Sequence, residues 1–406
     1  MSSLSVMKII DEICEISKDE TGAIARLPFS DSWMGAQMYL KTLFEKLGLY
    51  AFFDCAGNLH GRTGSSMGTV GDTIMTGSHV DTVKNAGKFD GLYGVVGGAL
   101  AISRLCKRYG MPNKILEVIA FSEEEGSRFP YNFFGSKALI GDVEWDEVVI
   151  LKDELGISIV EALLSKGFVF TPKCAKRSDI KAFVELHVEQ GGMLAAHNME
   201  IGVVAGIVGY RKFSIEIFGE ANHAGTTPMC YRKDAGFCAS QIISEIIKRA
   251  RDSGNTLVST IGQIEFQPNL TCVIPEYAKF SLDMRHSDKS ALDRFQNEVI
   301  NVIVDITTKE GTTFSFQEIL NTAPVSMDKN IMDVIKKACI SQRLAHMKIQ
   351  SGAAHDSQIL SRVTSVGMIF VPSKDGISHS PKEFTEATQL ERGVSILEET
   401  LHKLAY

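Results

Sequence analysis

The amino-acid sequence predicts an α/β fold in which a helix-covered sheet is interrupted by a smaller α+β insert. Apolar runs of strand length alternate with helical patterns in the amino-terminal half of the chain, and this alternation returns after about Leu320. Between these regions, from about Gly209, apolar and polar residues alternate as in half-exposed strands. We therefore expect one domain over residues 1–207 and 323–406, with a second domain, residues 208–322, inserted into it.

The elements of the larger domain follow from their periodicity. Helices are predicted where apolar residues recur at helical spacing, and buried strands where short apolar runs stop at polar or glycine residues. The predicted helices are 31–49, 94–110 and 331–344. The predicted strands are 72–82, 115–126, 182–188 and 365–373.

The predicted insert combines alternating strands with a long helix. Strands are expected at 211–220, 256–266 and 276–286, and a helix at 234–252. A helix of this kind can cover one face of an antiparallel sheet. The insert is therefore expected to be a compact α+β unit.

Composition narrows the class of partner. A net charge of −7 without blocks of like charge argues against binding to nucleic acid or to anionic lipid. The sequence has no apolar run long enough to span a membrane and no signal-peptide pattern at its start. Its eight cysteines lack C-x-x-C pairs, which favours unpaired packing residues in a reducing compartment. We expect a cytoplasmic protein that acts on small molecules.

Histidine and carboxylate side chains gather where the predicted strands end. In an open α/β sheet, ligands bind beyond the carboxyl ends of the strands, because the loops leave a crevice there. The residues at these ends are His79 and Asp81, Glu123, Glu124 and Glu125, His187 and Glu189, and His379, with Asp90 at the start of a glycine-rich turn. Histidines with carboxylates suit zinc or manganese, and a shared carboxylate lets two ions lie side by side. We therefore expect a two-metal site.

The three consecutive glutamates suggest a division of labour. Adjacent side chains diverge once a strand ends, so one carboxylate can bind metal while its neighbour acts as a base. Like charges at the end of a buried strand also repel one another, and cations relieve that repulsion. The alternative is a solvated helix start for the glutamates and a hydrogen-bonded core position for a lone histidine. We assign that ordinary role to His60, His197, His286, His346 and His402.

Six motifs occur in order over nearly the whole chain, and they are TGSHVDTVKNAGKFDG, FSEEEGSRFPYNFFGSK, DIKAFVELHVEQG, NHAGTTPM with YRKDA, SGAAHD and MIFVPSKDGISHSPKE. They resemble the two-metal amidohydrolases that include N-carbamoyl-L-amino-acid hydrolases and allantoate amidohydrolases, within the aminoacylase and dimetal carboxypeptidase superfamily. The resemblance implies a metallopeptidase-like catalytic domain with a helix-flanked mixed sheet and an inserted dimerisation or lid domain. The allantoate branch is the most similar.

The resemblance implies two divalent metal ions in each subunit. His79, Asp90 and His187 would hold one ion, with Asp90 as the bridging ligand, while Glu125 and His379 would hold the second. These ligand types accept manganese, zinc, cobalt or nickel, so the resemblance does not identify the metal. Manganese or zinc is the preferred expectation.

Catalytic roles are implied in the same way. Asp81 would orient His79, and Glu124 would be the general base that takes a proton from the attacking water and returns it to the leaving nitrogen. His223 would stabilise the negative charge that develops on the carbamoyl oxygen. Because the resemblance places this histidine in the site of the partner subunit, we expect a homodimer whose insert closes over the substrate.

The resemblance also implies substrate contacts. Arg285 would grip the substrate carboxylate as a bidentate fork. Gln190, Asn269 and His355 match positions that face the substrate, as does His223. The ordinary alternative for Arg285 is an exposed residue at a strand end.

Three positions depart from the family pattern and leave the substrate open. Cys272 replaces a usual asparagine, Ala354 replaces a usual glycine, and Tyr210 stands where glutamine is frequent in the allantoate branch. Hydrolysis of the carbamoyl group of allantoate leads, and an N-carbamoyl-L-amino acid or another ureido acid is the close alternative. An aminopeptidase and a catalytically inactive binding or scaffolding relative are further alternatives. The retained Glu124 speaks against the last of these, because a binding protein needs no base.

Overall fold

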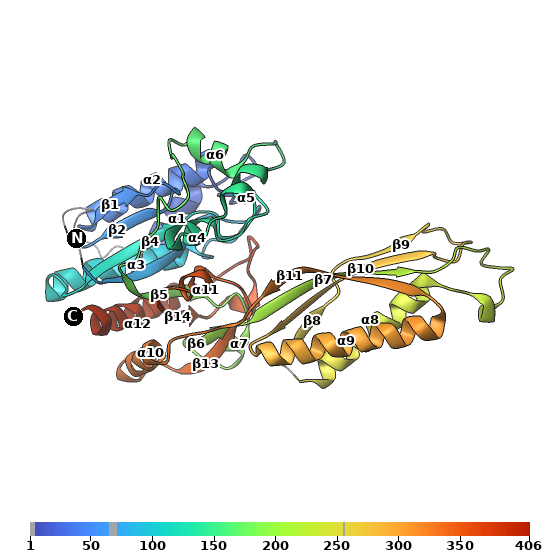
Figure 1. Ribbon diagram of the computed structural model, residues 1–406. Coiled ribbons are helices and arrows are strands. Elements are labelled where there is room, and N and C mark those ends of the chain that lie inside the picture. Colours follow the sequence, from blue (N-terminus) through green and yellow to red (C-terminus); the bar gives the residue numbers. More distant parts are fainter. Residues whose placement is uncertain (1–4, 65–70, 255) are drawn as a thin grey trace. The chain divides into compact units, whose positions relative to one another are not determined.

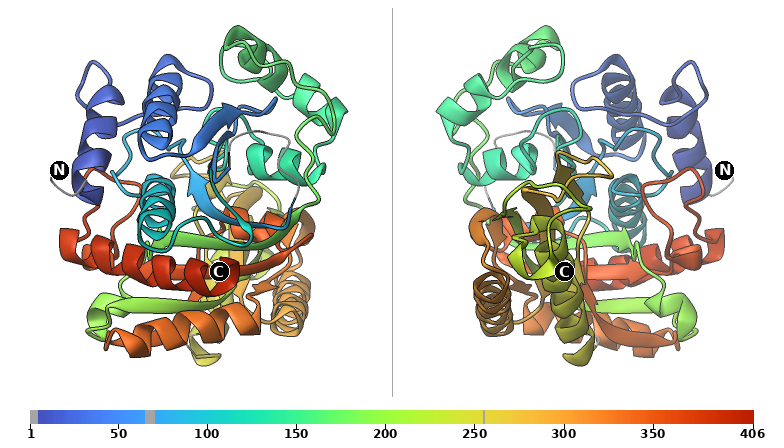
Figure 2. Two further views of the ribbon diagram at one scale, coloured as in Figure 1. Left: turned by 90° about the vertical axis from the view of Figure 1, so that its left-hand side faces the viewer. Right: turned by 90° about the vertical axis from the view of Figure 1, so that its right-hand side faces the viewer.

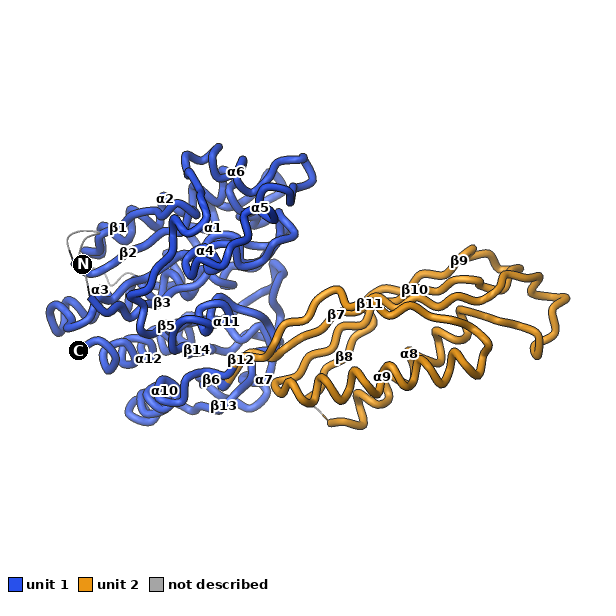
Figure 3. Tube along the Cα trace, viewed as in Figure 1, with its two compact units in different colours: residues 1–205, 326–406 blue, residues 206–325 orange. Residues whose placement is uncertain are grey.

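The computed structural model describes residues 5–64, 71–254 and 256–406, and these form two compact units. The first unit comprises residues 1–205 and 326–406, and the second comprises residues 206–325 (Figure 3). The boundaries expected from the sequence lie two to three residues from these. Each unit has a hydrophobic core of its own.

A nine-stranded mixed sheet forms the centre of the first unit (Figure 1). The strand order is β1-β2-β4-β3-β5-β14-β6-β12, and β13 also pairs with β6. The strands are β1 Tyr50–Phe53, β2 Leu59–Arg62, β3 Thr73–His79, β4 Ile115–Phe121, β5 Ile180–Val188, β6 Ile201–Ile207, β12 Val325–Ser326, β13 His346–Ser351 and β14 Ser365–Val371. Neighbours β4, β3, β5 and β14 run parallel to one another, so their carboxyl ends lie at one edge of the sheet.

Helices cover both faces of this sheet because its parallel strands are apolar on both sides. Successive side chains of β5 point to opposite faces. Leu186 approaches Gly97 of α3, whereas Glu185 bonds to Ser357 of α11. These two helices therefore lie on opposite faces. The helices of the unit are α1 Val6–Ile16, α2 Asp31–Lys46, α3 Leu92–Tyr109, α4 Phe134–Ile140, α5 Trp145–Ile150, α6 Ile159–Ser165, α7 Met193–Ala196, α10 Lys329–Ser341, α11 Asp356–Leu360 and α12 Ala387–Ala405.

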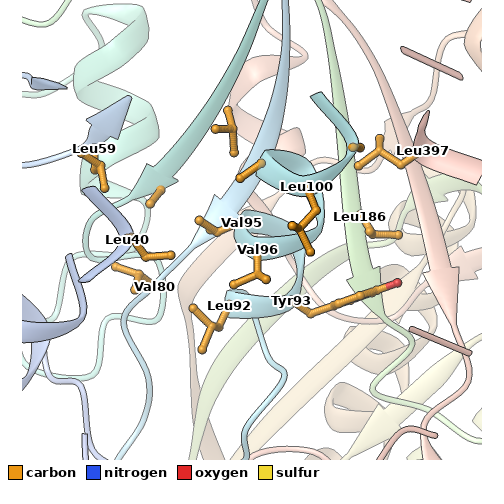
Figure 4. Close-up of a cluster of buried hydrophobic side chains, with 14 of the residues drawn as sticks. Leu40, Leu59, Val80, Leu92, Tyr93, Val95, Val96, Leu100, Leu186 and Leu397 are labelled. Atoms are coloured by element: carbon orange, nitrogen blue, oxygen red, sulfur yellow. The ribbon is translucent and has the colours of Figure 1, made fainter. Parts of the chain in front are cut away.

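Helix α3 approaches the sheet closely because it is rich in small residues. A Cβ at Gly94 would lie 2.3 Å from the backbone oxygen of Leu186, so only glycine allows this approach. The larger side chains Val95, Val96 and Leu100 of the same helix are buried in the hydrophobic core around it (Figure 4). Helix α12 packs beside α3 (Figure 2). Its amino-terminal end is tied to α3 by the Tyr93 hydroxyl, which donates to the Leu390 carbonyl at 2.7 Å.

The second unit is an antiparallel sheet with two long helices. Its strand order is β11-β7-β10-β8, and β9 also pairs with β10. The elements are β7 Gly209–Phe218, β8 Val258–Thr260, β9 Ile264–Gln267, β10 Tyr277–His286, β11 Thr313–Thr322, α8 Ala235–Asp252 and α9 Lys289–Glu310, with the 3-10 turn η1 Met229–Tyr231. Every second residue of β7 is buried, as its alternating sequence predicts, and Phe213, Ile215 and Ile217 among them belong to this unit's core.

The single strand predicted over 256–266 is wrong, because the structure has two short strands there. Strand β8 pairs with residues 283–285 of β10, and β9 pairs with residues 277–280. Between them the Ser281 hydroxyl accepts the backbone N–H groups of Gly262 and Gln263, at 3.3 and 3.1 Å. These two N–H groups are therefore bound to a side chain instead of to a β10 carbonyl, and the ladder is interrupted.

The expectation of eight unpaired packing cysteines is wrong for four of them. Cys55 and Cys174 form a disulfide with a Cα–Cα distance of 6.2 Å, although 119 residues separate them in the chain. Cys230 and Cys272 are exposed. Cysteine spacing along the chain gave no signal for either result, because the tertiary fold decides which segments meet. Among the described residues, no helix has both the length and the apolar character that a bilayer crossing needs.

His60 is a buried core histidine with two carboxylate partners, as its ordinary assignment predicted. Its Nδ1 lies 2.7 Å from Glu117 and its Nε2 lies 3.2 Å from Asp54. Burial alone would lower the pKa of His60, but these two acids outweigh it and raise the pKa to about 9. Arg177 contacts the same glutamate at 3.0 Å. Burial would raise the pKa of Glu117, but His60 and Arg177 lower it to about 2.

We predict that this cluster makes the stability of the protein fall at alkaline pH. The folded-state pKa of His60, about 9, exceeds its unfolded value, so its contribution is complete below about pH 6.5 and is lost as the pH rises towards 9. The midpoint of thermal unfolding should therefore decrease more steeply between these pH values in the wild type than in His60→Gln. Parallel pH profiles of the two proteins would contradict the assignment.

Candidate metal centre

The residues predicted to bind metal converge at the carboxyl edge of the parallel strands. His79 is the last residue of β3 and pairs in register with Phe121, the last residue of β4. The glutamate run, residues 123–125, follows β4 after one residue, Ser122. His187 lies near the end of β5 and pairs in register with Phe370 of β14. The ladder therefore aligns side chains that lie far apart in the sequence.

Asp90 lies at the centre of this cluster. Its Oδ1 is 3.4 Å from Nε2 of His79 and 3.2 Å from Nε2 of His187. Its Oδ2 is 3.1 Å from Nε2 of His379, and this histidine lies 3.3 Å from Oε1 of Glu125. One carboxylate thus faces two groups of ligand atoms, one on each of its oxygens.

Within the part of the chain that the structure describes, three sets of side chains bring their ligand atoms within 4.8 Å of one another. Asp90 belongs to two of these sets. The sets are His79 with Asp90 and His187, His79 with Glu124 and Glu125, and Asp90 with Glu125 and His379. The donor atoms are histidine nitrogens and carboxylate oxygens, which suit divalent zinc or manganese.

The backbone fixes which nitrogen of two histidines is available. Nδ1 of His79 lies 3.0 Å from the carbonyl of Asp81, and Nδ1 of His187 lies 2.9 Å from the carbonyl of Val188. A carbonyl only accepts hydrogen bonds, so each Nδ1 carries the hydrogen. In the neutral imidazoles, the lone pairs of Nε2 then face Asp90. This orientation is the one that a metal ligand needs.

The electrostatics of the cluster favour positive charge. Burial would raise the pKa of Asp90, but its three histidine neighbours hold it well below the usual range. Contacts with Asp90 and Glu125 raise the pKa of His379 to about 10. Burial and the nearby charge of Glu125 raise the pKa of Glu124 well above the usual range, against the opposing effect of His79. A bound cation would stabilise the charged form of each carboxylate.

The acidic run is a tight buried turn and not the solvated helix start of the alternative interpretation. Glu123 has a φ of 51° and is fully buried, and Glu124 is 7% exposed. The next helix, α4, starts only at Phe134. Glu124 and Glu125 reach the histidine cluster while Glu123 lies outside all three ligand sets. The side chains of the run therefore diverge as the sequence predicted.

Asp81 contacts the site with both its main chain and its side chain. Its backbone carbonyl contacts the His79 ring, while its carboxylate lies 3.8 Å from Nδ1 of that ring. The carboxylate instead accepts the backbone N–H groups of Glu124, at 3.0 and 3.1 Å, and of Glu125, at 3.1 Å. Asp81 therefore orients His79 through its main chain and holds the acidic turn with its side chain.

Glycine is required at position 91 for two reasons. Gly91 has a φ of 65°, and a Cβ there would lie 2.5 Å from Nδ1 and Cε1 of His79. Its N–H lies 3.1 Å from Nε2 of His187, which agrees with a lone pair on that nitrogen. The glycine-rich turn thus lets the start of α3 approach both rings.

Two polar side chains lie within hydrogen-bond distance of Oδ2 of Asp90. The amide of Gln190 lies at 2.8 Å and the hydroxyl of Ser378 at 3.2 Å. Gln190 was predicted as a substrate contact, and in the structure its amide nitrogen bonds to the central carboxylate. His355 is buried, with its ring centre 4.6 Å from that of His187 and its Nε2 2.9 Å from the Ser351 hydroxyl. Ala354 directly precedes it.

The remaining predicted substrate contacts belong to the second unit. Nδ1 of the exposed His223 accepts N–H groups from Gly225 and Thr226, at 3.0 and 3.2 Å. The hydrogen of the neutral ring is therefore on Nε2, which makes that atom a hydrogen-bond donor. His223 forms a β-bridge with Val273, next to Cys272. Asn269 lies in the same loop with a φ of 58°.

Arg285 lies near the end of β10 and is held by its neighbours. Its guanidinium bonds to both carboxylate oxygens of Asp283, at 2.9 and 3.2 Å, and lies 5.6 Å from the ring centre of Tyr210. The side chain is 37% exposed. It is therefore oriented before any substrate binds.

Sequence reasoning missed Glu185 and Ser378. Glu185 is fully buried and accepts hydrogen bonds from Ser78, at 2.7 Å, and from both the N–H and the hydroxyl of Ser357. It ties β3 and α11 to β5 beneath the site. A charged residue inside the apolar run AFVELHV was an available signal for it. Ser378 had no signal beyond its place beside His379.

Comparisons with known proteins agree with this fold and this cluster. Residues 75–403 match the model of peptidase family M20/M25/M40. The chain is 38% identical over 405 residues to an allantoate amidohydrolase from Bacillus subtilis (strain 168), with 99% of this chain and 98% of that protein covered. It is 33% identical over 400 residues to an N-carbamoyl-L-amino-acid amidohydrolase from Pseudomonas sp. (strain NS671), covering 97% and 96%.

A solved structure supports the same assignment. An amidase of the hydantoinase/carbamoylase family from Burkholderia multivorans superposes with a TM-score of 0.91 at 29% identity, covering 98% of this chain and 97% of that one. Fold and site thus define a hydrolase of the mixed α/β class, with a histidine and carboxylate cluster that could bind metal. The chain belongs to peptidase family M20/M25/M40, and the resemblance inferred from the sequence is confirmed.

We predict that Asp90→Asn weakens metal binding more than substitution of a residue that is not a proposed metal ligand. The substitution removes the negative charge shared by the two groups of ligand atoms, so affinity for Mn²⁺ should fall by more than about 100-fold. Metal content after dialysis, measured by mass spectrometry, reports this change. Asp375→Asn is the matched control, since Asp375 is exposed in the loop that carries His379. Equal metal content in both variants would contradict the role of Asp90.

Proposed function

We propose that this protein hydrolyses the carbamoyl C–N bond of a ureido acid, and that the leading substrate is allantoate. The products would be ureidoglycine, carbon dioxide and ammonia. The observation that carries the reaction type is the convergence of His79, His187 and His379 on Asp90, with the buried Glu124 beside them. The match to an allantoate amidohydrolase, at 38% identity, supports the substrate.

Two divalent ions fit this donor set. His79, Asp90 and His187 would hold one, and Asp90, Glu125 and His379 would hold the other. When bound, the ions would lower the pKa of water at the site and polarise the carbamoyl oxygen. Manganese or zinc is the leading metal, and the same ligands also accept cobalt or nickel.

Glu124 is proposed as the general base. Its Oε2 lies 3.9 Å from Nε2 of His79, so the carboxylate borders the cluster. It would take a proton from the attacking water and deliver it to the leaving nitrogen, so that the C–N bond breaks to give an amine and carbamic acid, which decomposes to carbon dioxide and ammonia. Burial and neighbouring acids disfavour the charged form of Glu124, which makes it a stronger base once cations keep it ionised.

The second unit is proposed to supply substrate contacts and a dimer interface. Nε2–H of His223 can donate to the oxygen on which charge develops during attack. Arg285, oriented by Asp283, would bind the substrate carboxylate, and Asn269 would be a further polar contact from this unit. Gln190 and His355 of the first unit would also contact the substrate. We propose a homodimer in which His223 serves the site of the partner subunit and the inserted unit closes over the substrate.

The close alternative is an N-carbamoyl-L-amino acid or another ureido acid as substrate. The match to an N-carbamoyl-L-amino-acid amidohydrolase, at 33% identity, supports it. Cys272 and Ala354 stand where the family pattern has asparagine and glycine, and Tyr210 stands where glutamine is frequent in the allantoate branch, so the three residues favour a changed pocket. An inactive binding relative is the minor alternative.

The substrate proposal is tested with purified, manganese-loaded protein. We expect ammonia release from allantoate at a higher kcat/KM than from any member of a panel of N-carbamoyl-L-amino acids. Ammonia release from the carbamoyl amino acids alone would end the allantoate proposal and support the close alternative. Absence of turnover with either class in metal-loaded protein would favour the inactive relative.

The base is tested with Glu124→Gln. The substitution keeps the shape of the side chain and removes its ability to take a proton, so kcat should fall by at least about 100-fold. Metal content should remain that of the wild type, because the ligands of the two proposed ions are unchanged. Glu144→Gln, at an exposed position, is the control. Unchanged turnover in Glu124→Gln would refute its assignment.

The shared site is tested by subunit mixing. Glu124→Gln and His223→Asn should each be inactive alone. If His223 serves the partner's site, a mixed dimer has one site with both wild-type residues. Random mixing should then restore about one quarter of wild-type activity, because half of the dimers are mixed. A monomeric mass in analytical ultracentrifugation, or mixing without recovery, would contradict the dimer proposal.

A further inference from the structure

Glu383 is a buried carboxylate that none of the roles above includes. It is 4% exposed and lies in the loop that connects η2, Lys374–Gly376, to α12. Burying a carboxylate is costly unless it is hydrogen-bonded. Its bonds therefore indicate what the side chain is for.

The carboxylate binds the segment that carries Asp90. Oε1 of Glu383 accepts the backbone N–H of Phe89 at 2.6 Å and that of Asp90 at 3.2 Å. These are the two N–H groups immediately before the glycine turn at Gly91. Their position fixes the main chain from which the central carboxylate of the cluster projects.

The second oxygen of Glu383 connects to the other end of the same ligand. Oε2 lies 3.0 Å from the hydroxyl of Ser378, and that hydroxyl lies 3.2 Å from Oδ2 of Asp90. The hydroxyl carries one hydrogen and can donate it to either carboxylate. The carboxylate of Glu383 thus contacts the backbone N–H of Asp90 directly. It contacts the carboxylate of Asp90 through the hydroxyl of Ser378.

Gly87 leaves the space that this arrangement needs. A Cβ at Gly87 would lie 2.4 Å from Cδ of Glu383, 2.5 Å from its Cβ and 2.6 Å from its Oε1. Gly87 does not have a positive φ, so its backbone conformation does not require glycine. The close approach of the Glu383 side chain does. The side chain of Glu383 therefore packs against Gly87 and bonds to the N–H groups of Phe89 and Asp90.

We propose that Glu383 is a positioning residue for Asp90: it holds the main chain and the carboxylate of Asp90 in the place from which one ligand faces both groups of histidines. The inference rests on the proposed function only in taking Asp90 as a ligand of divalent cations. It needs no particular substrate. Its consequence is that metal affinity depends on a residue that touches no metal.

The proposal is tested by titrating metal-free protein with Mn²⁺ in a calorimeter and by measuring the Tm of the same metal-free samples. Glu383→Ala should raise the Kd for Mn²⁺ by about tenfold or more, while the metal-free protein keeps its fold. Glu383→Gln retains an acceptor for the two backbone N–H groups, so it should recover most of the affinity. Lys382→Gln, at the exposed neighbouring position, should bind as the wild type does.

A second variant keeps the test decisive if Glu383→Ala does not fold. Gly87→Ala pushes Glu383 away from the Asp90 segment and should also raise the Kd.

Two results would overturn the inference. A Kd within about twofold of the wild type in the folded Glu383→Ala or Gly87→Ala protein would do so, and so would a lowered metal-free Tm with unchanged Kd, which describes a loop anchor only. Failure of the proposed function is recognised separately: the wild type would bind Mn²⁺ and release no ammonia from any ureido acid. A wild type that binds neither Mn²⁺ nor Zn²⁺ would refute the metal centre and this inference together.

Discussion

The structure depends on placing one buried carboxylate, Asp90, between histidines that come from three different segments of the chain. At 4% exposure this side chain has lost most of its hydration, and nitrogen atoms of three histidines lie within 3.4 Å of its oxygens. A buried charge in such a position costs free energy unless opposite charge compensates it. The cluster compensates it with imidazoles in the metal-free protein, and divalent cations would do so more completely.

The parallel sheet makes this placement possible. Neighbouring parallel strands end at the same edge, so residues that are remote in sequence arrive there side by side. The backbone then sets the orientation of each group: main-chain carbonyls fix the Nδ1 hydrogens of His79 and His187, and the Asp81 carboxylate fixes the acidic turn. Side-chain chemistry at the site is thus selected by main-chain hydrogen bonds as much as by the ligands themselves.

Sequence reasoning succeeded where a residue type carries its own chemistry. The strands at 72–82, 115–126, 182–188 and 365–373 and the ligand residues beyond them were visible because apolar runs stop at histidines and acids. It failed where a partner decides the role. The carboxylate of Asp81 binds the N–H groups of the acidic turn, and Glu383 binds those of Phe89 and Asp90. Neither contact was predicted, because neither sequence position states which backbone N–H groups will face it.

The sequence by itself determined the class of the protein, the alternation of strands and helices, and the set of side chains able to bind cations, since these follow from hydrophobic period and from residue chemistry. Only the tertiary structure decided which of those side chains meet, which nitrogen each imidazole presents, and that Cys55 pairs with Cys174. The physical reason is that distance and orientation in space come from long-range packing and hydrogen bonds, and spacing along the chain does not encode them.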